Sequence, residues 1–462
     1  MTLLLVNPNR ETKPVPAMPV GLLRVAEAAE REGVPVQVLD LAFASRPERL
    51  LRATIAKVKP SAVGFTVRNI DNADFRAPRF YLDEVRPLVA VARECCTGPI
   101  VIGGAGASMA PEAVRLDLGA DCVVVGPGEG VVTRIHDAAT GGERLPTVLF
   151  GPADHPTNPA ADYARWLNLA PWKRLAAPLP VQSRRGCPRK CVYCNYAAID
   201  GTSKYVLGDV DEVVDCIREL VERTRIPHVE FVDSTFNSPP TYAIALCEAL
   251  ARADLGVSLG ASGITPRYAS REVLEAMKAA GFSAIWCSPD TAAPETIRSY
   301  GKGFARDDLS VMARSAEELG FTVMWSFLFG GPGETESTVA ETLRFAREEI
   351  PADHPVMLTS RMRIYPGTEL ARIVQAEGLP APVLDPRVPG QFYLSSHVDA
   401  ERLDAMLFEA HESLPNLMYL AAAQGPVVGL LQRMNGLLGR RQPTWADYAP
   451  IRRRVMKMLG RA

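Results

Sequence analysis

Short apolar runs alternate with amphipathic stretches over the first 140 residues of the chain. Runs of three to five largely apolar residues predict buried parallel strands at residues 3–6, 36–39, 62–66, 100–102 and 122–125. Between them the apolar residues recur at helical spacing, for example over residues 20–32 and 83–94. This alternation predicts a doubly wound, Rossmann-like α/β domain over residues 1–150.

A second alternation of strands and helices begins near residue 181. Strands are predicted at residues 181–184, 228–232, 257–262, 284–288, 322–329 and 357–364, and a helical stretch follows each of them. Six strand and helix units predict a partial (β/α)6 barrel similar to a TIM barrel, which we assign to residues 176–388. Catalytic groups in such a barrel lie at the carboxyl ends of the strands.

Two further segments flank the predicted barrel. Residues 151–175 are rich in Pro and Trp and show little periodicity, which predicts a linker packed across a domain surface. Residues 389–462 are predicted to form a C-terminal helical domain, with helices at residues 400–414, 416–431 and 448–459.

The chain has 462 residues, is 47% hydrophobic and carries a formal net charge of -2 at pH 7. It therefore lacks the basic excess of most nucleic-acid-binding proteins. No apolar stretch reaches the roughly 20 residues of a membrane helix, and no basic region precedes the first apolar run. Nine cysteines without a secretory signal favour a reducing compartment with free thiols. We expect a cytoplasmic protein with neither nucleic-acid nor membrane partners.

Cys187, Cys191 and Cys194 lie in the run RRGCPRKCVYC, just after the first predicted barrel strand. Three thiolates at this spacing can hold three irons of a 4Fe-4S cluster, and no fourth cysteine lies nearby to complete the set. One iron would stay open for a substrate or a cofactor. A structural zinc site is disfavoured because it is normally closed by four Cys or His ligands.

Three more motifs follow strands at the same mouth of the predicted barrel. Asp233 lies in FVDSTF after the second strand, Asp290 lies in SPD after the fourth, and residues 330–334 form GGPGE after the fifth. Each has a plainer explanation, since an Asp after a strand is often a helix cap and a glycine-rich run is often only a turn. Their shared position beside the cysteines favours a common site.

In combination these motifs resemble the radical S-adenosylmethionine enzymes, and the resemblance covers residues 181–380. It implies that Cys187, Cys191 and Cys194 bind a 4Fe-4S cluster whose open iron takes the amino and carboxylate groups of S-adenosylmethionine. An electron, from a donor such as flavodoxin or ferredoxin, then breaks the sulfonium bond to give a 5'-deoxyadenosyl radical. The family's Pro-Gly-Thr after the sixth strand is matched at residues 366–368, and a Lys-Gly pair is matched at residues 302–303.

The resemblance also implies contacts with S-adenosylmethionine. The implied contacts are Tyr193, Gly330 and Gly331 at the adenine, Asp233 at the methionyl amine, Asp290 at the ribose hydroxyls and Arg267 at the carboxylate. The two glycines would let the backbone approach the adenine because they have no side chain. No side chain is assigned as a catalytic acid, base or nucleophile.

The N-terminal domain resembles the cobalamin-binding domain that precedes the barrel in cobalamin-dependent radical enzymes. The Pro-rich start of its first helix, at residues 16–23, is similar to theirs, and so are the turns after the third, fourth and fifth strands. The residues that this resemblance places at cobalamin are Thr66, Gly103, Gly104, Gly126 and Glu129. A generic flavodoxin-like domain with tight turns is the plainer alternative for each motif taken alone.

One motif of methionine synthase-like cobalamin domains is missing. The Asp-x-His-x-x-Gly run that supplies a lower-face imidazole is absent, and none of the six histidines follows the first strand. Arg68, in the loop after the third strand, is our candidate for a non-coordinating cation beneath the corrin, because a protonated guanidinium has no lone pair to donate to cobalt. The alternative is that Arg68 pairs with Asp71 at the domain interface.

These features predict a cobalamin-dependent radical S-adenosylmethionine enzyme, and most specifically a C-methyltransferase acting on an unactivated carbon of a small metabolite. A second hypothesis keeps cobalamin but ends in rearrangement, cyclisation or oxidation without methyl transfer. In a third, the cobalamin domain is vestigial and a 3-amino-3-carboxypropyl group is transferred. A non-enzymatic iron-sulfur sensor is disfavoured because a sensor does not need the adenosine-facing motifs.

Overall fold

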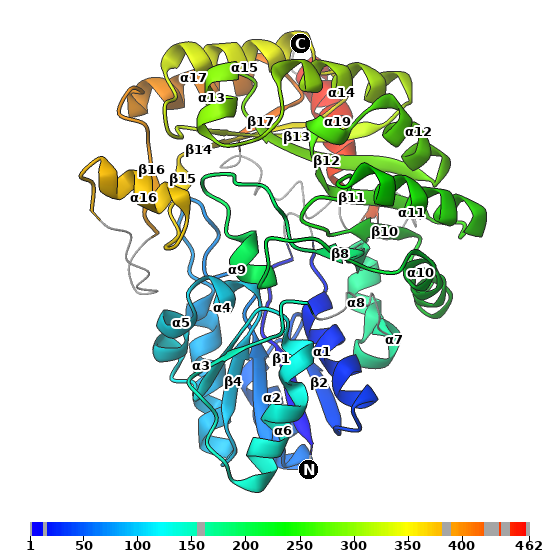
Figure 1. Ribbon diagram of the computed structural model, residues 1–462, viewed down its shortest axis with the longest axis vertical. Helices are drawn as coiled ribbons and strands as arrows, with labels where there is room; N and C mark the ends of the chain where they lie inside the picture. The colour runs from blue at the N-terminus through cyan, green and yellow to red at the C-terminus, as the bar shows by residue number, and fades with distance from the viewer. Residues whose placement is uncertain are drawn as a thin grey trace.

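The computed structural model describes residues 2–12, 16–154, 162–380, 390–419, 434–435 and 444–458. These residues form two α/β domains, which lie one above the other in Figure 1 with helix α9 (Tyr196–Asp200) between them. Helix α9 belongs to the upper domain and contacts α4 (Ala105–Met109) of the lower one. The predicted α/β class, with a parallel sheet in each domain, is confirmed.

The N-terminal sheet has six parallel strands in the order β2-β1-β3-β4-β5-β6. The strands are β1 (Leu3–Asn7), β2 (Val36–Asp40), β3 (Ala62–Thr66), β4 (Ile100–Gly103), β5 (Cys122–Val125) and β6 (Val148–Phe150). The helices around them are α1 (Val20–Arg31), α2 (Pro47–Val58), α3 (Leu82–Cys95), α5 (Pro111–Leu118) and α6 (Val132–Gly141). Strands β1 to β5 occupy the five predicted places, whereas β6 carries too weak an apolar signal because it has three residues and ends at the exposed Phe150.

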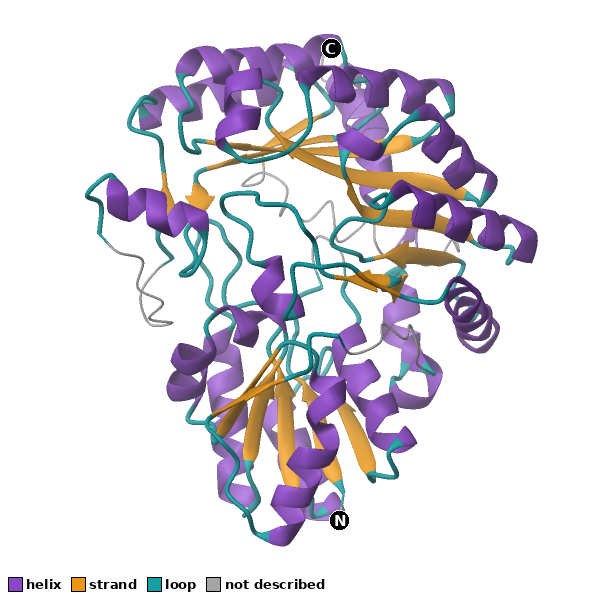
Figure 2. Cartoon of the chain, in the orientation of Figure 1, coloured by secondary structure: helices purple, strands orange, loops and turns teal. Residues whose placement is uncertain are grey.

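Helices cover both faces of this sheet (Figure 2). In β1, Leu4 and Val6 pack into the core shared with α2 and α3, while Leu3 packs with α1 and α6 on the opposite face. Both faces of the strand are therefore buried, which is why it is continuously apolar instead of alternating. The carboxyl ends of the strands point toward the second domain.

The second sheet has seven parallel strands in the order β17-β14-β13-β12-β11-β10-β7. The strands are β7 (Leu179–Val181), β10 (His228–Phe231), β11 (Ser258–Ile264), β12 (Phe282–Asp290), β13 (Thr322–Phe329), β14 (Val356–Ser360) and β17 (Leu417–Tyr419). The helices on its outer face include α10 (Val210–Thr224), α11 (Pro240–Ala253), α12 (Arg271–Ala279), α13 (Pro294–Ser299), α14 (Arg306–Glu318), α15 (Glu336–Glu348) and α17 (Ala400–Ser413). The predicted partial barrel is thus present, with one strand more than predicted.

The first and sixth predicted barrel strands differ from the prediction. The first strand is β7, and the predicted strand residues 184–185 instead form β8 (Arg184–Arg185), which pairs antiparallel with β9 (Val206–Leu207). The predicted strand 357–364 breaks at Arg361, whose φ of 65° is left-handed. The chain then continues as β15 (Met362–Arg363), which pairs antiparallel with β16 (Phe392–Tyr393) and is followed by helix α16 (Glu369–Ala376).

The C-terminal segment is only partly helical. Helices α17 and α19 (Tyr448–Met458) lie at two of the predicted places, and a short helical turn covers Thr444–Asp447. The predicted helix at 416–431 is wrong at its start, because Leu417–Tyr419 is a buried strand that pairs with β14 and closes that edge of the sheet. Residues 420–431 lie outside the described residues.

Two short helices, α7 (Tyr163–Trp166) and α8 (Leu169–Arg174), lie in the segment that we predict as a linker. The Tyr163 hydroxyl donates to the carbonyl oxygen of Pro180, 2.6 Å away, at the start of the barrel. The Trp172 indole nitrogen donates to a carboxylate oxygen of Asp40, 3.2 Å away, in the N-terminal domain. Both aromatic side chains are buried, so the segment fixes one domain against the other.

Within the described ranges, we find no helix with the length and apolarity of a membrane span.

Candidate cofactor site between the two domains

The three cysteines lie in a loop that joins β8 to helix α9. Each is partly buried and free of disulfides. The Cys187 sulfur lies 3.6 Å from the Thr235 hydroxyl, and the Val192 amide donates to the carbonyl oxygen of Tyr300 across 3.1 Å. Gly186, at the start of the loop, has a φ of 77°, and a Cβ atom there would lie 1.9 Å from the carbonyl oxygen of Lys204. The backbone conformation therefore requires glycine immediately before the first cysteine.

The thiols interact electrostatically with one another. Burial raises the pKa of Cys194 to about 11, and the neighbouring Cys191 and Cys187 raise it further. Burial likewise raises the pKa of Cys191. No group of three His, Cys, Asp or Glu side chains in the described part of the chain surrounds a single metal ion. A cubane does not need such a group, because each thiolate would bind a different iron.

A buried triad lies beside the cysteine loop. The Tyr193 hydroxyl and the Lys302 ammonium both donate to Oδ2 of Asp290. The ammonium also donates to the Tyr193 oxygen at 3.2 Å and to the carbonyl oxygen of Ser288 at 3.1 Å. Asp290 has a φ of 67°, so its carboxylate is presented from a left-handed turn at the end of β12. The structure thus brings Tyr193 and Asp290 together, and their contacts with adenine and ribose stay predictions.

Lys302 completes this triad, and sequence reasoning uses it only as a family marker. The sequence does contain a signal for this role: Asp290 and Lys302 have opposite charges and both lie in segments predicted at the barrel mouth. Burial of the ammonium would lower the pKa of Lys302, but Asp290 and Tyr193 hold it well above its usual range. Lys302 therefore stays charged and fixes the Asp290 carboxylate.

The GGPGE turn is held from within the protein. A Cβ atom on Gly331 would lie 2.4 Å from Cε1 of Tyr300, and the Gly331 amide donates to the Tyr300 hydroxyl across 2.8 Å. The Glu334 carboxylate accepts from the Gly330 amide and, at 3.1 Å, from that hydroxyl. Burial raises the pKa of Glu334 to about 7. The close approach of Tyr300 is a reason for glycine at 331 that the sequence does not reveal, and the adenine contact of both glycines stays a prediction.

Asp233 and Arg267 occupy different surroundings. Asp233 is buried and accepts hydrogen bonds from the Ser183 amide at 2.7 Å and the Ser183 hydroxyl at 2.6 Å. It also accepts from the Arg184 amide at 3.1 Å, so its carboxylate holds the corner between β7 and β8. Arg267 is exposed and donates to the carbonyl oxygen of Gly303 at 2.9 Å. Their contacts with the methionyl amine and the carboxylate stay predictions.

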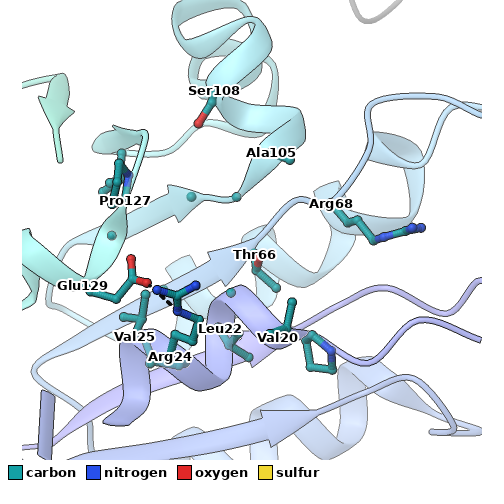
Figure 3. Close-up of a pocket in the computed structure, with 18 of the residues that line it drawn as sticks. Val20, Leu22, Arg24, Val25, Thr66, Arg68, Ala105, Ser108, Pro127 and Glu129 are labelled. Atoms are coloured by element: carbon teal, nitrogen blue, oxygen red, sulfur yellow. Dashed lines mark ion pairs between the residues drawn. The ribbon is translucent and has the colours of Figure 1, made fainter. Parts of the chain in front are cut away.

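A cavity of about 390 Å³ lies in the N-terminal domain, between the sheet and helices α1 and α6 (Figure 3). All the residues predicted to contact cobalamin line it: Thr66, Arg68, Gly103, Gly104, Gly126 and Glu129. The small residues Ala62 and Gly64 of the central strand β3 line its inner wall. A large side chain at either position would fill the space, so the cavity follows from the sequence of one face of β3.

Gly104 shapes the mouth of this cavity. Its φ is 98°, and a Cβ atom there would lie 2.6 Å from the carbonyl oxygen of Val67 and 2.8 Å from the Thr66 hydroxyl oxygen. At Gly103 the nearest atom would be 3.8 Å away, so a side chain there would extend into free space. Glycine at 104 is therefore required by the backbone, while glycine at 103 keeps the cavity open.

Arg68 is exposed and lines the same cavity (Figure 3). The alternative pairing of Arg68 with Asp71 is wrong, because Asp71 accepts hydrogen bonds from Arg363 at 3.0 Å and 2.9 Å. Among the residues that the structure describes, Arg68 has no ion pair. Its guanidinium is thus a cation at the cavity that forms no ion pair with a described residue.

The cysteine-bearing domain forms part of the wall of this cavity. Gln182, Arg185, Ile199, Asp200 and Val232 all line it. A Cβ atom on Gly126 would lie 3.6 Å from the Cα atom of Gly201, directly after α9. Sequence motifs do not predict this contact, since the residues that meet are far apart in the chain. The segments on either side of the cysteine loop therefore form part of the cavity wall.

Comparisons with known proteins match both halves of this site. Residues 181–346 match the family model of the radical SAM superfamily, and residues 11–136 match that of the B12 binding domain. An uncharacterized methyltransferase of Pyrococcus horikoshii is 25% identical over 385 residues, which cover 78% of this chain and 79% of the relative. A tryptophan 2-C-methyltransferase of Streptomyces laurentii is 32% identical over 142 residues, covering 30% of this chain and 23% of that protein.

Among solved structures, the radical S-adenosylmethionine methyltransferase TsrM from Kitasatospora setae superposes with a TM-score of 0.84 at 21% identity. The match covers 99% of this chain and 98% of TsrM, in a structure with cobalamin and a [4Fe-4S] cluster bound. A second TsrM structure, with a TM-score of 0.83, has tryptophan as substrate. The comparisons confirm the predicted pair of domains and the predicted cofactors S-adenosylmethionine, cobalamin and 4Fe-4S.

We predict that the variant with Cys187, Cys191 and Cys194 all changed to Ala binds no cluster, because the three irons that these thiolates would bind lose their protein ligands. Iron should fall from about four per chain to a background level after anaerobic reconstitution. Cys216→Ala is the matched control, since Cys216 is another partly buried cysteine and lies in α10. A triple variant that kept a full cluster would show that other ligands hold the iron.

We predict that Gly103→Trp abolishes cobalamin binding, because a side chain at this position would extend into the free space of the cavity. Binding can be followed by the absorption spectrum of the protein after removal of free cobalamin. Gly141→Trp is the control: its Cβ position has no atom within 4 Å, and Gly141 does not line the cavity. Equal cobalamin binding by the two variants would contradict the placement of the cofactor.

Proposed function

Since this chain is a radical S-adenosylmethionine enzyme that carries a B12-binding domain, we propose that it is a cobalamin-dependent C-methyltransferase acting on an unactivated carbon of a small metabolite. One observation supports this most strongly. The cavity that contains the predicted cobalamin residues is walled in part by the domain that presents the three cysteines. Cofactors held at the two places would therefore face the same space, as consecutive use on one substrate requires.

The residues present fit the three cofactors. When bound, the cluster, S-adenosylmethionine and cobalamin supply the electron-transfer and methyl-transfer chemistry that protein side chains lack. Cys187, Cys191 and Cys194 would hold the iron, and the cavity at Gly103 and Gly104 would take the nucleotide tail of cobalamin. The contribution of the protein is then to bind, to orient and to exclude water.

Arg68 would leave the cobalt of a bound cobalamin without a lower protein ligand. A protonated guanidinium is a hydrogen-bond donor only, so it cannot coordinate a metal. Arg68 lines the cavity and makes no ion pair with a residue in the described part of the chain. We propose that this cation keeps cobalt free of a lower protein ligand and so favours methyl transfer.

The triad of Tyr193, Asp290 and Lys302 would position S-adenosylmethionine. Its three polar groups are fixed by mutual hydrogen bonds, and such preorganised groups orient a bound ligand without further loss of conformational entropy. Lys302 and Tyr193 both donate to Oδ2 of Asp290, so they fix how its carboxylate would meet the ribose hydroxyls. We therefore propose that the triad as a unit, and not Asp290 alone, forms the ribose site.

The substrate would enter the concave side of the barrel sheet. Ser262 and Ser288 are exposed although they lie in the central strands β11 and β12, so this face of the sheet is open. The likeness to TsrM, whose structure holds tryptophan, makes tryptophan the first small molecule to test.

An electron donor such as flavodoxin or ferredoxin would reach the cysteine loop, where Lys190 is exposed.

We predict that each turnover yields S-adenosylhomocysteine and 5'-deoxyadenosine in equal amounts, because two molecules of S-adenosylmethionine serve two separate roles. Both nucleosides can be quantified by liquid chromatography with mass spectrometry. Deoxyadenosine without S-adenosylhomocysteine would indicate rearrangement, cyclisation or oxidation. Methylthioadenosine as the main product would indicate transfer of the aminocarboxypropyl group, and either result would reject the methyltransferase.

Asp290→Asn should lower the yield of deoxyadenosine roughly 10-fold or more, because the loss of one positioning group disturbs the alignment of the reacting atoms. Its buried partner Lys302 would keep hydrogen-bond acceptors in Tyr193 and in the carbonyl oxygen of Ser288. Asp307→Asn, in the first turn of α14, is the matched surface control and should leave the yield unchanged. Equal yields from the two variants would remove Asp290 from the site.

We predict that cobalamin bound in the cob(II)alamin state shows no nitrogen superhyperfine splitting in its paramagnetic resonance spectrum. The reason is that the cavity offers Arg68 and not an imidazole. Free cob(II)alamin with its own base coordinated is the positive control for the splitting. Coupling to one nitrogen in the protein-bound form would contradict the proposal for Arg68.

A further inference from the structure

Four side chains from the two domains form a buried polar junction on the wall of the cofactor cavity. Nε of Arg24 lies 3.0 Å from Oε1 of Glu129, an ion pair drawn in Figure 3. From the barrel domain, Nη2 of Arg185 donates to the same Glu129 oxygen. Nη1 of Arg24 donates to Oε1 of Gln182 at 2.7 Å. The side chains of Arg24, Glu129 and Arg185 are 4%, 5% and 7% exposed, so the junction is almost fully dehydrated.

The junction carries more positive than negative charge. Two guanidinium groups share a single carboxylate. Burial would raise the pKa of Glu129, but Arg24 and Arg185 lower it, so the carboxylate is ionised. Burial lowers the pKa of Arg24 only to about 10, so it stays protonated at neutral pH. Asp200, which also lines the cavity, accepts from the Gly186 amide at 2.9 Å; burial raises its pKa, whereas Arg185 and Arg24 lower it.

Two donors of this junction lack acceptors. Nη1 of Arg185 and Nε of Arg24 are buried and make no hydrogen bond within the described part of the chain. The Nε group of Arg24 is close to Glu129 but is not aligned with it. A buried donor without an acceptor is costly, and so is a buried cation without a full counter-charge. An anion bound in the cavity beside the two arginines would supply the missing counter-charge.

We propose that Arg24 and Arg185 bind the phosphodiester of the nucleotide tail of cobalamin. This inference rests on the proposed function, because it takes cobalamin as the occupant of the cavity. Both arginines line the cavity together with Gly103 and Gly104, where the tail would enter. The phosphodiester is the anionic group of that tail, and the planar fork of Arg suits phosphate oxygens better than any other side chain.

The position of Arg185 gives this contact a second consequence. Arg185 lies two residues before Cys187 and belongs to the barrel domain, whereas Arg24 belongs to α1 of the N-terminal domain. One phosphate held by both would therefore join the two domains next to the cluster ligands. The plainer alternative is that Glu129 and the two arginines only fasten the domains together, with no role toward a ligand.

The two explanations differ in how Arg185→Met affects cobalamin and cobinamide, the analogue that lacks the phosphodiester and the base. We expect cobalamin affinity to fall roughly 10- to 100-fold, the range for loss of a charge-assisted hydrogen bond. Cobinamide affinity should change less than about 3-fold by the same reasoning. Cobinamide phosphate, which keeps the phosphate without the base, should lose affinity as cobalamin does. Dissociation constants can be measured by ultrafiltration with the full-length, cluster-reconstituted protein.

Arg363→Met is the matched control. Arg363 is also a barrel-domain arginine with an 8% exposed side chain, and it pairs with Asp71 of the N-terminal domain, but it does not line the cavity. It should leave the affinities for all three ligands unchanged. Arg185→Lys, which keeps the charge, should retain part of the cobalamin affinity. If Arg185→Met does not fold, Arg24→Met provides the same comparison from the other domain.

Equal losses of cobalamin and cobinamide affinity in Arg185→Met would overturn the inference and leave only the fastening role. Unchanged affinities for both ligands in Arg185→Met would overturn it as well. The same holds if inorganic phosphate binds through Arg185 but does not compete with cobalamin. The wild-type protein separates this inference from the proposed function. A wild-type chain that binds neither cobalamin nor cobinamide rejects the function itself.

Discussion

The contact of the cysteine loop with the carboxyl edge of the N-terminal sheet is the constraint on which the rest of the site depends. Helix α9 packs on α4, Gly201 touches the turn at Gly126, and the buried Arg185 reaches Glu129. Charged groups withdrawn from water in this way must stay paired, because breaking a buried pair leaves an uncompensated charge. The loop is thus fixed over the cavity, and the two predicted cofactor sites cannot separate without cost.

The cavity itself exists because one face of a buried sheet is built from small residues. Ala62 and Gly64 face α1, while Val63 and Phe65 fill the core on the other side of the same strand. Close packing normally leaves few voids in such a domain, so an apolar cavity of this size indicates a binding site. Small residues also shape the barrel mouth, where the glycine turn leaves room for Tyr300. The Tyr300 hydroxyl accepts from the Gly331 amide and donates to Glu334, which fixes the turn.

The sequence predicts those features that leave a local pattern. Parallel strands buried on both faces appear in the sequence as apolar runs, and the cysteine spacing predicts the cluster loop. The strand Leu417–Tyr419 is missed because its three residues are too few to show the spacing of apolar positions that distinguishes a strand from the neighbouring helical pattern. The buried state of Asp233, the Asp71 to Arg363 pair and the junction of Arg24 with Arg185 all depend on residues distant in the chain. Such contacts follow from the docking of the domains, which no local pattern describes.

The central claim is that one chamber holds both redox centres, and paramagnetic resonance of the fully loaded protein tests it most directly. Samples containing cob(II)alamin, the reduced cluster, or both would be compared at low temperature. The structure predicts that each signal is broadened by the other centre, because the segments on either side of the cysteine loop form part of the cavity wall. Two unperturbed signals that simply add, from a protein with both cofactors fully bound, would contradict it.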